Sequence, residues 1–595
     1  MSRARDLADS ADKDIVGTIT VDGLTVAGNV SADGGTIKLD GNYPVGTDNV
    51  ALGNTALDSV QSGGNYNVAV GANAGTAITT GDSNVAIGDV ALTANTTASN
   101  NVAVGSVAMN VNTTGGNNVA VGMQSLRNNT TASNNVAVGF NALTANTTAG
   151  YNVALGTNTL AGNTTGSENA VFGGAAALAN TTGTGLTGAG YTALRFNTTG
   201  NYNTALGDAA LYSNTTASNN TAVGYQSLFS NVTHTTLTAV GYQALYNNTA
   251  DDNTAVGWKA MFTNTTGSLS VAVGRSALED NTTGGSNTAL GYAPLSNNST
   301  GSNNVAIGRQ ALLNNTTSSN NTAVGYQAGY NKTSGGNFTA VGYQAGRDLT
   351  TGGENSFFGR GAGEKDTTGY RNTFLGYSCG SEITTGNRNT IIGAYNGNQL
   401  GLDIRTSSKN IVLSDGDGNP RVYIADGGDV QINKTDGTQN TRGIILNGYG
   451  TIRANAQTTE ALHLIRSTAG NIARFWHNNT TLVGNINVTS TGTSYGTTSD
   501  HRLKENVDYT WDATTRLKQL KPARFNFIVD ADTTVDGFLA HEAQAVVPEA
   551  VTGTHNEVDE DGNAEYQSID QSKLVPLLVK TIQELEARIT ALEGA

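Results

Sequence analysis

Cysteine is almost absent from the 595-residue sequence, which contains Cys379 and no other. A single cysteine excludes an internal disulfide framework and any metal site built from clustered cysteines. Cys379 stands where related segments of the chain usually have alanine, so we interpret it as a small buried residue rather than a reactive thiol. We therefore predict no cysteine-based chemistry, no metal site and no cofactor.

Basic residues and long apolar runs are also scarce. The sequence has 32 Lys and Arg against 47 Asp and Glu, and no basic patch stands out. Because nucleic-acid binding depends on neutralising phosphates with Lys and Arg, nucleic acid is not expected as a partner. No run of about 18 apolar residues occurs, and the opening MSRARDLADSADKD is polar. We expect neither a membrane-inserted helix nor an N-terminal secretory signal.

Glycine, in contrast, is abundant and periodic, with 75 residues in the chain. Over residues 49–393 a unit of 17 residues ends in glycine, as in NVAVG at residues 118–122. The step is 17 residues throughout, except 18 between Gly53 and Gly71 and 16 between Gly241 and Gly257. Such a period is typical of solenoids, in which each unit buries its apolar face only by stacking on its neighbours.

Each unit predicts one coil of a parallel β-solenoid or β-roll. The residues before the glycine predict one short strand. The residues after it, such as YQSL at residues 225–228, predict a second strand, and the NTTG or NTTA motif predicts a turn. With coils about 4.8 Å apart, the shaft would be roughly 100 Å long. Successive side chains of a strand point to opposite faces, and both faces of a VAV strand are apolar. One face can fill the interior of the coil, so the other must be covered by other chains. A closed homotrimer would cover it symmetrically.

Equivalent residues of successive coils are expected to stack in columns. The asparagine that begins most strands can form a hydrogen-bonded ladder. A stripe of aromatic residues follows the glycines, for which stacking between coils is favoured over glycan binding as the explanation. The NTT triplets match glycosylation sequons but are sufficiently explained as turns. The stripe consists of Tyr225, Tyr242, Trp258, Tyr292, Tyr326 and Tyr343.

Three further parts complete the predicted domain organisation. Residues 1–48 read as short strands that serve as a cap or an attachment segment, and residues 394–498 as a β-rich stem with Asp-Gly and Asn-Gly turns. Asp415 and Asp417 resemble a calcium loop loosely, but no glutamate follows at the required spacing, so a plain turn is preferred. Residues 499–595 are much more charged and predict a separate α+β domain that ends in a helix over 573–593.

The start of this last domain, TTSDHRLKENV at residues 497–507, contains a possible catalytic pair. A serine becomes a nucleophile only when a base takes its proton, and a lysine can be that base when burial or neighbouring charge lowers its pKa. Lys504 follows Ser499 by five residues on a predicted loop or turn, which places it within reach. His501 and His541 are alternative proton carriers, although for His541 a surface or packing role is favoured.

The last 96 residues resemble the C-terminal intramolecular chaperone domain of phage tailspikes and tail fibres, a self-cleaving peptidase family. The resemblance implies a chaperone that trimerises the preceding β-structure and then cleaves the chain between Ser499 and Asp500, with Ser499 and Lys504 as the catalytic dyad. The repeats are similar, more weakly, to the heads of trimeric autotransporter adhesins, whose typical unit is shorter. The chaperone motifs are Ser499, Asp500, Arg502, Leu503, Lys504, Asn506 and Val507, then GFLAHEAQAVVPEAV at 537–551 and SKLVPLLVKTIQELEARI at 572–589.

The C-terminal helix carries a short heptad seam with spacings of 4, 3, 4 and 3 residues. Such a seam predicts a trimerisation helix in a coiled coil. The alternative is a helix packed on its own domain, and the seam alone does not select the number of chains. Its residues are Leu578, Ile582, Leu585, Ile589 and Leu592.

Together these features predict a phage tail fibre, a homotrimeric host-attachment rod made in the host cytoplasm and located in the virion tail. Its partners would be tail or baseplate proteins and a cell-surface receptor, either a glycan or an outer-membrane component. Enzymatic activity stays open and would be limited to one self-cleavage. A tailspike depolymerase is an alternative, but glycoside hydrolysis needs paired carboxylates in a cleft. The repeats are nearly uncharged, and Asp251 with Asp252 is too little to suggest such a site. A bacterial trimeric adhesin would need a secretory signal and a membrane segment, and neither is visible.

Overall fold

The structure is a computed structural model that describes residues 46–432, 443–446, 452–455, 470–477, 481–497, 499–559 and 562–595. The chain forms two compact units, Met1–Leu462 and His463–Ala595, and the division falls within the predicted stem. Of the predicted N-terminal segment, only residues 46–48 lie within the described residues. No helix in these ranges is long and apolar enough to span a membrane.

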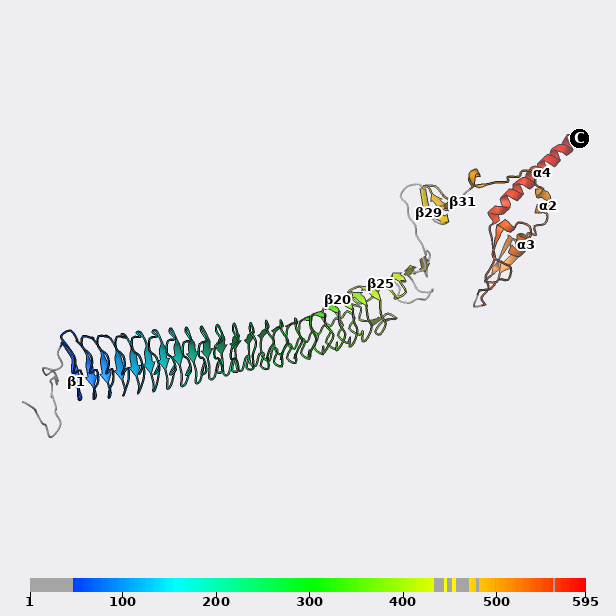
Figure 1. Cartoon of the computed structure of the whole chain (residues 1–595). Coiled ribbons are helices and arrows are strands. Elements are labelled where there is room, and N and C mark those ends of the chain that lie inside the picture. The colour runs from blue at the N-terminus through cyan, green and yellow to red at the C-terminus, as the bar shows by residue number, and fades with distance from the viewer. Residues whose placement is uncertain are drawn as a thin grey trace, which may run out of the picture. The chain divides into compact units, whose positions relative to one another are not determined.

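The first unit contains a β-solenoid in which each 17-residue repeat makes one coil (Figure 1). Every coil contributes one strand of three residues, and each strand pairs in parallel and in register with the next, so that Ala120 lies between Ala103 and Ala137. The predicted parallel β-solenoid is therefore confirmed. Its strands are β1 Val50–Leu52, β2 Val68–Val70, β3 Val85–Ile87, β4 Val102–Val104, β5 Val119–Val121, β6 Val136–Val138, β7 Val153–Leu155, β8 Ala170–Phe172, β9 Thr187–Ala189, β10 Thr204–Leu206, β11 Thr221–Val223, β12 Thr238–Val240, β13 Thr254–Val256, β14 Val271–Val273, β15 Thr288–Leu290, β16 Val305–Ile307, β17 Thr322–Val324, β18 Thr339–Val341, β19 Ser356–Phe358, β20 Thr373–Leu375 and β21 Thr390–Ile392.

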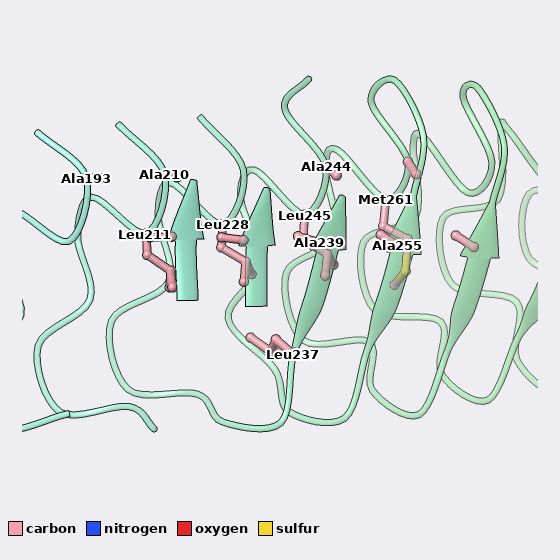
Figure 2. Packing of buried hydrophobic residues seen from close by; sticks show 14 of the residues in the cluster. Ala193, Ala210, Leu211, Leu228, Leu237, Ala239, Ala244, Leu245, Ala255 and Met261 are labelled. Atoms are coloured by element: carbon pink, nitrogen blue, oxygen red, sulfur yellow. The ribbon is translucent and has the colours of Figure 1, made fainter. Parts of the chain in front are cut away.

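The interior of the coils is filled by the middle residue of each strand and by the leucine four positions after the glycine. Ala239 and Leu245 are fully buried examples, and Figure 2 shows them beside Leu228 and Ala255 of the neighbouring coils. The repeat glycine allows the coils to stack closely. At Gly122, where φ is +131°, an added Cβ would lie 2.5 Å from the carbonyl oxygen of the glycine in the next coil.

The prediction of a second strand in each coil is wrong. Alternate residues of this segment have positive φ, for example Gln226 and Leu228 at +52°, so the chain forms a series of turns. The backbone still bonds to both neighbouring coils: the N–H of Gln226 donates to the Asp208 carbonyl and the N–H of Leu228 to the Ala244 carbonyl, both at 3.0 Å. Because the sign of φ alternates, the backbone groups of this segment form hydrogen bonds to both neighbouring coils, although the segment bends too sharply for a strand.

Two columns of buried asparagines run along the solenoid. The predicted ladder at the start of the strands is confirmed, because Oδ1 of Asn101 accepts from the backbone N–H of Asn118 at 3.0 Å. A second ladder comes from the NTT turns, where Nδ2 of Asn112 donates to Oδ1 of Asn95 at 3.1 Å. Asn95 and Asn112 are fully buried, so these sequon asparagines cannot carry a glycan in the folded coil.

The third residue of every strand is apolar along the whole solenoid, whereas the first residue, which is also partly exposed, is threonine in many coils. The residue directly before each repeat glycine is Val, Leu, Ile, Phe or Ala in all 21 coils. These side chains are partly exposed, reaching 45% at Leu290 and 48% at Leu375. A monomeric protein rarely exposes one continuous apolar stripe of this extent.

Large and small residues exchange places near the C-terminal end of the solenoid. In the coil of Gly359, Phe357 takes the place of the buried alanine and Gly363 that of the leucine. A Cβ on Gly363 would lie 2.6 Å from Cε2 of Phe357, whose ring stacks on Phe374 with 4.9 Å between centroids. The glycine therefore provides the space that the phenylalanine occupies.

We expect Gly363→Leu, which restores the usual leucine, to lower the free energy of unfolding by about 1–3 kcal/mol through overpacking. The backbone itself accommodates leucine, because Leu228 has nearly the same φ as Gly363. Adding Phe357→Ala should recover most of the lost stability, as thermal unfolding followed by circular dichroism would show. Unchanged stability of Gly363→Leu, or no recovery in the double variant, would contradict this packing.

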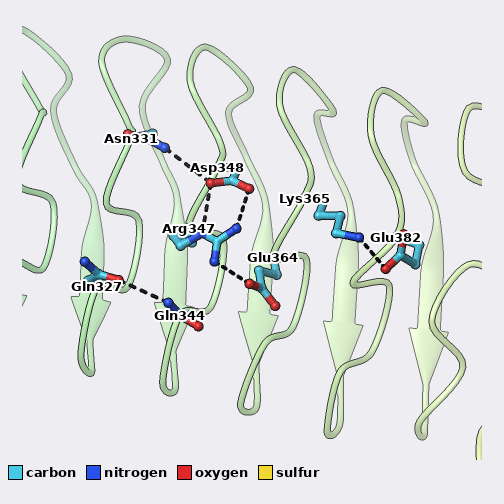
Figure 3. A network of polar contacts seen from close by, with 8 residues as sticks. All are labelled: Gln327, Asn331, Gln344, Arg347, Asp348, Glu364, Lys365 and Glu382. Atoms are coloured by element: carbon cyan, nitrogen blue, oxygen red, sulfur yellow. Dashed lines mark hydrogen bonds and ion pairs between the residues drawn. The ribbon is translucent and has the colours of Figure 1, made fainter.

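The same coils are joined by polar side chains that pair from one coil to the next (Figure 3). Arg347 connects Asp348 of its own coil with Glu364 of the next, at 2.8 and 2.6 Å. Exposed ion pairs contribute little one by one, so the network matters as a set. The further pairs are Gln327 with Gln344 at 3.1 Å, Asn331 with Asp348 at 3.3 Å and Lys365 with Glu382 at 2.6 Å.

After the last coil the parallel stack continues into antiparallel strands. β24 pairs in parallel with β21, and β25 to β28 follow it as antiparallel neighbours. Asp415 lies in the turn between β24 and β25 and accepts from the N–H of Asn419 at 2.8 Å. Hydrogen bonds from Asn419 and Arg421 hold the pKa of Asp415 at about 2, as in a plain turn. The strands are β22 Asn398–Gln399, β23 Leu402–Asp403, β24 Ile411–Ser414, β25 Pro420–Ile424, β26 Val430–Ile432, β27 Gly443–Leu446 and β28 Ile452–Asn455.

The second unit begins with a three-stranded antiparallel sheet, β29 to β31, and continues into a small α+β region. Its core consists of Ala513, Val547, Ala550, Leu574 and Leu577. The elements are β29 Gly470–His477, β30 Thr481–Val488, β31 Thr493–Thr497, η1 His501–Leu503, α2 Ala513–Leu517, β32 Ala523–Phe527, β33 Asp530–Gly537, α3 Ala540–Gln544, η2 Pro548–Ala550, β34 Val551–Thr552, β35 Ser568–Ile569, η3 Gln571–Leu574 and α4 Val575–Glu593.

Candidate functional site

The candidate site lies at the short 3-10 helix η1, directly after the β29–β31 sheet. Asp500 caps this helix, since its side chain accepts from the N–H of Arg502 at 2.9 Å. The guanidinium of Arg502 also donates to the same carboxylate, at 3.0 and 2.7 Å. These bonds from Arg502 lower the pKa of Asp500, so the residue on the carboxyl side of the predicted cleavage bond is held as a carboxylate.

The turn of η1 brings the two predicted catalytic residues together. The backbone N–H of Lys504 donates to the His501 carbonyl at 3.0 Å, which ends the helix. Beyond this bond the lysine side chain folds back, and its Nζ donates to Oγ of Ser499 at 2.7 Å. The five-residue spacing therefore produces a direct contact, within the distance that a nucleophile and its base require.

Both members of the pair are exposed to solvent in the single chain. In the observed contact the lysine donates and the serine accepts, whereas a base must first lose its own proton. Removal of surrounding water favours the neutral form of a lysine. The contact between the two side chains is thus in place, in a position exposed to solvent.

Among the described residues, neither histidine side chain forms a hydrogen bond with Ser499 or Lys504. Nδ1 of His501 is 3.5 Å from the Asp500 carboxylate, and its side chain is exposed. His541, on α3, stacks on His555 with 4.2 Å between ring centroids. These positions favour a surface or packing role for His541.

Helix α4 uses two different faces. Leu577 and Thr581 are buried against the domain, whereas the five seam residues on the other face are all exposed, from 44% at Leu578 to 78% at Leu592. The helix therefore packs on its own domain with one face and exposes the seam on another.

Glu584 of α4 is a structural residue that the sequence reading missed. Its carboxylate accepts from the N–H groups of Ala513 and Thr514 at 2.9 and 2.8 Å and from the Thr514 hydroxyl at 2.6 Å. These bonds lower the pKa of Glu584 and join the start of α2 to α4. No local signal reveals the contact, because about 70 residues separate the partners.

A comparison with protein families finds a match in this part of the chain. Residues 499–552 match the family described as chaperone of endosialidase, and the match starts at Ser499 and includes Lys504, β32, β33 and α3. No curated protein and no solved structure matches the chain. A β-solenoid of 21 coils that precedes a chaperone-of-endosialidase domain fits a phage tail fibre or tailspike with a C-terminal chaperone.

Proposed function

We propose that this chain is a phage tail fibre, a host-attachment rod that its C-terminal chaperone assembles as a homotrimer. It is made in the host cytoplasm and becomes part of the virion tail, in contact with tail or baseplate proteins and a host receptor. The match of residues 499–552 to the chaperone of endosialidase, directly downstream of a long solenoid, carries this proposal.

Two exposed apolar surfaces support association of identical chains. The stripe before the repeat glycines repeats with the coil spacing, and a second copy of the chain offers a stripe with the same period. The seam of α4 offers a second contact, with Leu578, Ile582 and Leu585 all exposed. Long-range parallel β-structure folds slowly and exposes strand edges, which explains why such a rod would need a chaperone of its own.

The α4 seam provides a test of assembly with a matched control. Ile582→Asp places a charge in the proposed contact and should convert soluble trimers into monomers or aggregates. Gln583→Asp adds the same charge one residue away, at an exposed position outside the seam, and should leave the trimer intact. Analytical ultracentrifugation measures both, and equal behaviour of the two variants would contradict a role of the seam.

We further propose that the chaperone cleaves the bond between Ser499 and Asp500 after assembly. The net reaction is hydrolysis: the C–N bond breaks, the Ser499 carbonyl carbon gains a hydroxyl from water, and the Asp500 nitrogen leaves as an amine. Association of chains that covers Ser499 and Lys504 would remove water from the lysine and allow it to act as a base. Cleavage after folding would remove the aid to refolding, so that any unfolding of the assembled rod becomes irreversible and its stability is set by the rate of unfolding.

A tailspike depolymerase remains the second candidate. The paired acids that the sequence offers within the repeats, Asp251 and Asp252, accept hydrogen bonds from Thr235 and Thr236 at 2.6 and 2.5 Å. They thus serve as turn-stabilising residues between neighbouring coils. Release of oligosaccharides from host surface polysaccharide would favour the depolymerase over the fibre.

Immunogold labelling with antibodies against the solenoid tests the fibre directly. We expect label on the tails of purified phage particles. Label on the surface of uninfected bacteria instead would favour a bacterial adhesin and contradict the proposed function.

A further inference from the structure

A continuous column of flat side chains lies directly after the repeat glycines in ten successive coils, from Tyr225 to Tyr377. Three members are arginines, Arg275, Arg309 and Arg360, and the others are tyrosines and Trp258. We refer to this column as the aromatic–arginine ladder. The stripe predicted from the sequence contains six of its seven aromatic members, without Tyr377, and none of the three arginines.

Every member of the ladder stacks on the next. Tyr225 and Tyr242 stack with 5.4 Å between centroids, and the guanidinium carbon of Arg275 lies 4.8 Å from the Trp258 ring. The same pattern continues without a gap to Arg360, 5.5 Å from the Tyr377 ring. Since the flat faces cover one another, the ladder exposes edges, and Tyr377 is still 58% exposed.

The guanidinium groups of the ladder lack acidic partners. Arg275 and Arg309 form no ion pair with any residue in the described part of the chain, and Arg360 donates to the hydroxyl of Tyr377 at 2.9 Å. In contrast, Arg347 and Arg371 pair with carboxylates of the same solenoid. The ladder therefore holds three cations in fixed orientations by stacking on aromatic rings, with N–H donors left available.

We propose that the ladder is a binding surface for a linear acidic glycan, one that carries carboxylate or phosphate groups along its length. This proposal rests on the proposed function and names the class of receptor for it. A guanidinium fork matches a carboxylate or phosphate with two parallel hydrogen bonds, and tyrosine hydroxyls can bond to sugar hydroxyls. Arg275 and Arg309 are two coils apart and Arg309 and Arg360 three, about 10 and 14 Å, so the cations recur along a straight line.

Other occupants fit the ladder less well. Nucleic-acid binding depends on neutralising many closely spaced phosphates, whereas the ladder offers three cations about 10 and 14 Å apart. Another copy of this chain would have to cover three guanidinium groups, and the uncharged stripe before the glycines is the better contact for it. Sugar rings stacked on aromatic faces are disfavoured because neighbouring members of the ladder already occupy those faces.

Binding of the purified full-length chain to defined polymers tests the ladder. Polygalacturonate is the carboxylate probe, polyphosphate the phosphate probe and neutral dextran the uncharged control. We expect one acidic probe to bind, with affinity that falls as salt is added, and dextran not to bind. Arg309→Gln should weaken binding about tenfold, corresponding to about 1.4 kcal/mol, and the variant with all three arginines changed to Gln should lose it.

Arg127→Gln is the matched control, because Arg127 is an exposed arginine of the solenoid outside the ladder, and it should bind like the wild type. Arg309→Lys keeps the positive charge but not the two parallel N–H donors of the guanidinium, so it should bind better than Arg309→Gln but less well than the wild type. The proposal is overturned if neither acidic probe binds, if Arg309→Gln equals Arg127→Gln, or if the triple variant changes the oligomeric state, which would place the ladder between chains. A protein found on phage tails that binds no acidic probe would overturn the ladder alone, whereas one that binds but is absent from tails would contradict the proposed function alone.

Discussion

A denaturing gel of the wild-type protein is expected to show a chain that ends at Ser499, shorter by the 96 residues that follow it. Ser499→Ala removes the hydroxyl and Lys504→Ala removes the group in contact with it at 2.7 Å, so both variants should stay at full length. Loss of one member of a catalytic unit costs about as much as loss of all, so no partial cleavage is expected.

Two controls separate chemistry from folding. Lys504→Arg keeps the positive charge but cannot act as a base, and it should also remain uncut. Lys518→Ala removes an exposed lysine elsewhere in the same domain and should be cut normally. All variants should still form soluble trimers. A wild-type trimer that keeps its full length, confirmed by mass spectrometry, would contradict self-cleavage.

Mixed trimers would show how the dyad attacks the bond. The Ser499 hydroxyl could attack its own carbonyl carbon only by closing a strained four-membered ring. We therefore expect the dyad of one chain to cut another, so that Ser499→Ala chains assembled with wild-type chains are cleaved. If the Ser499→Ala chains stay intact beside cleaved wild-type chains, each dyad instead activates water for its own bond.

The repeat architecture could be predicted because a period in glycine and asparagine is visible without any knowledge of distant contacts. The turn segment at Gln226 and Leu228 could not, since glutamine and leucine do not indicate positive φ; neighbouring coils impose it. Similarly, the Ser499–Lys504 contact follows from a local spacing, whereas the bonds of Glu584 to α2 exist only after the domain has folded.

Two ionisable residues interrupt the second asparagine column near the end of the solenoid. Lys332 and Asp366 occupy positions that hold asparagine in earlier coils such as that of Asn315, and both are fully buried. Nζ of Lys332 donates to the carbonyls of Ser334 and Gly352, and the Asp366 carboxylate accepts from the N–H of Gly369 at 2.7 Å. Burial lowers the pKa of Lys332 to about 8 and raises that of Asp366 to about 7.

The solenoid should consequently lose stability as the pH rises from about 4 to above 7, because the folded state favours the neutral acid at Asp366. Complete ionisation of this buried group would cost about 4 kcal/mol relative to an ordinary aspartate. The effect at Lys332 has the opposite course: its penalty is present below about pH 8 and is relieved as the pH rises toward the ordinary lysine value.

Asp366→Asn restores the residue type of the column and should raise stability at pH 8 by up to about 4 kcal/mol, with little change at pH 4. Thermal unfolding or unfolding rates, measured for variant and wild type from pH 4 to pH 8, would show the two curves diverging as the pH increases. Asp208→Asn, at an exposed position of the solenoid, serves as control and should follow the wild type. A constant difference between Asp366→Asn and wild type across this range would mean that Asp366 has the same pKa in the folded and unfolded states, and would contradict a pKa raised by burial.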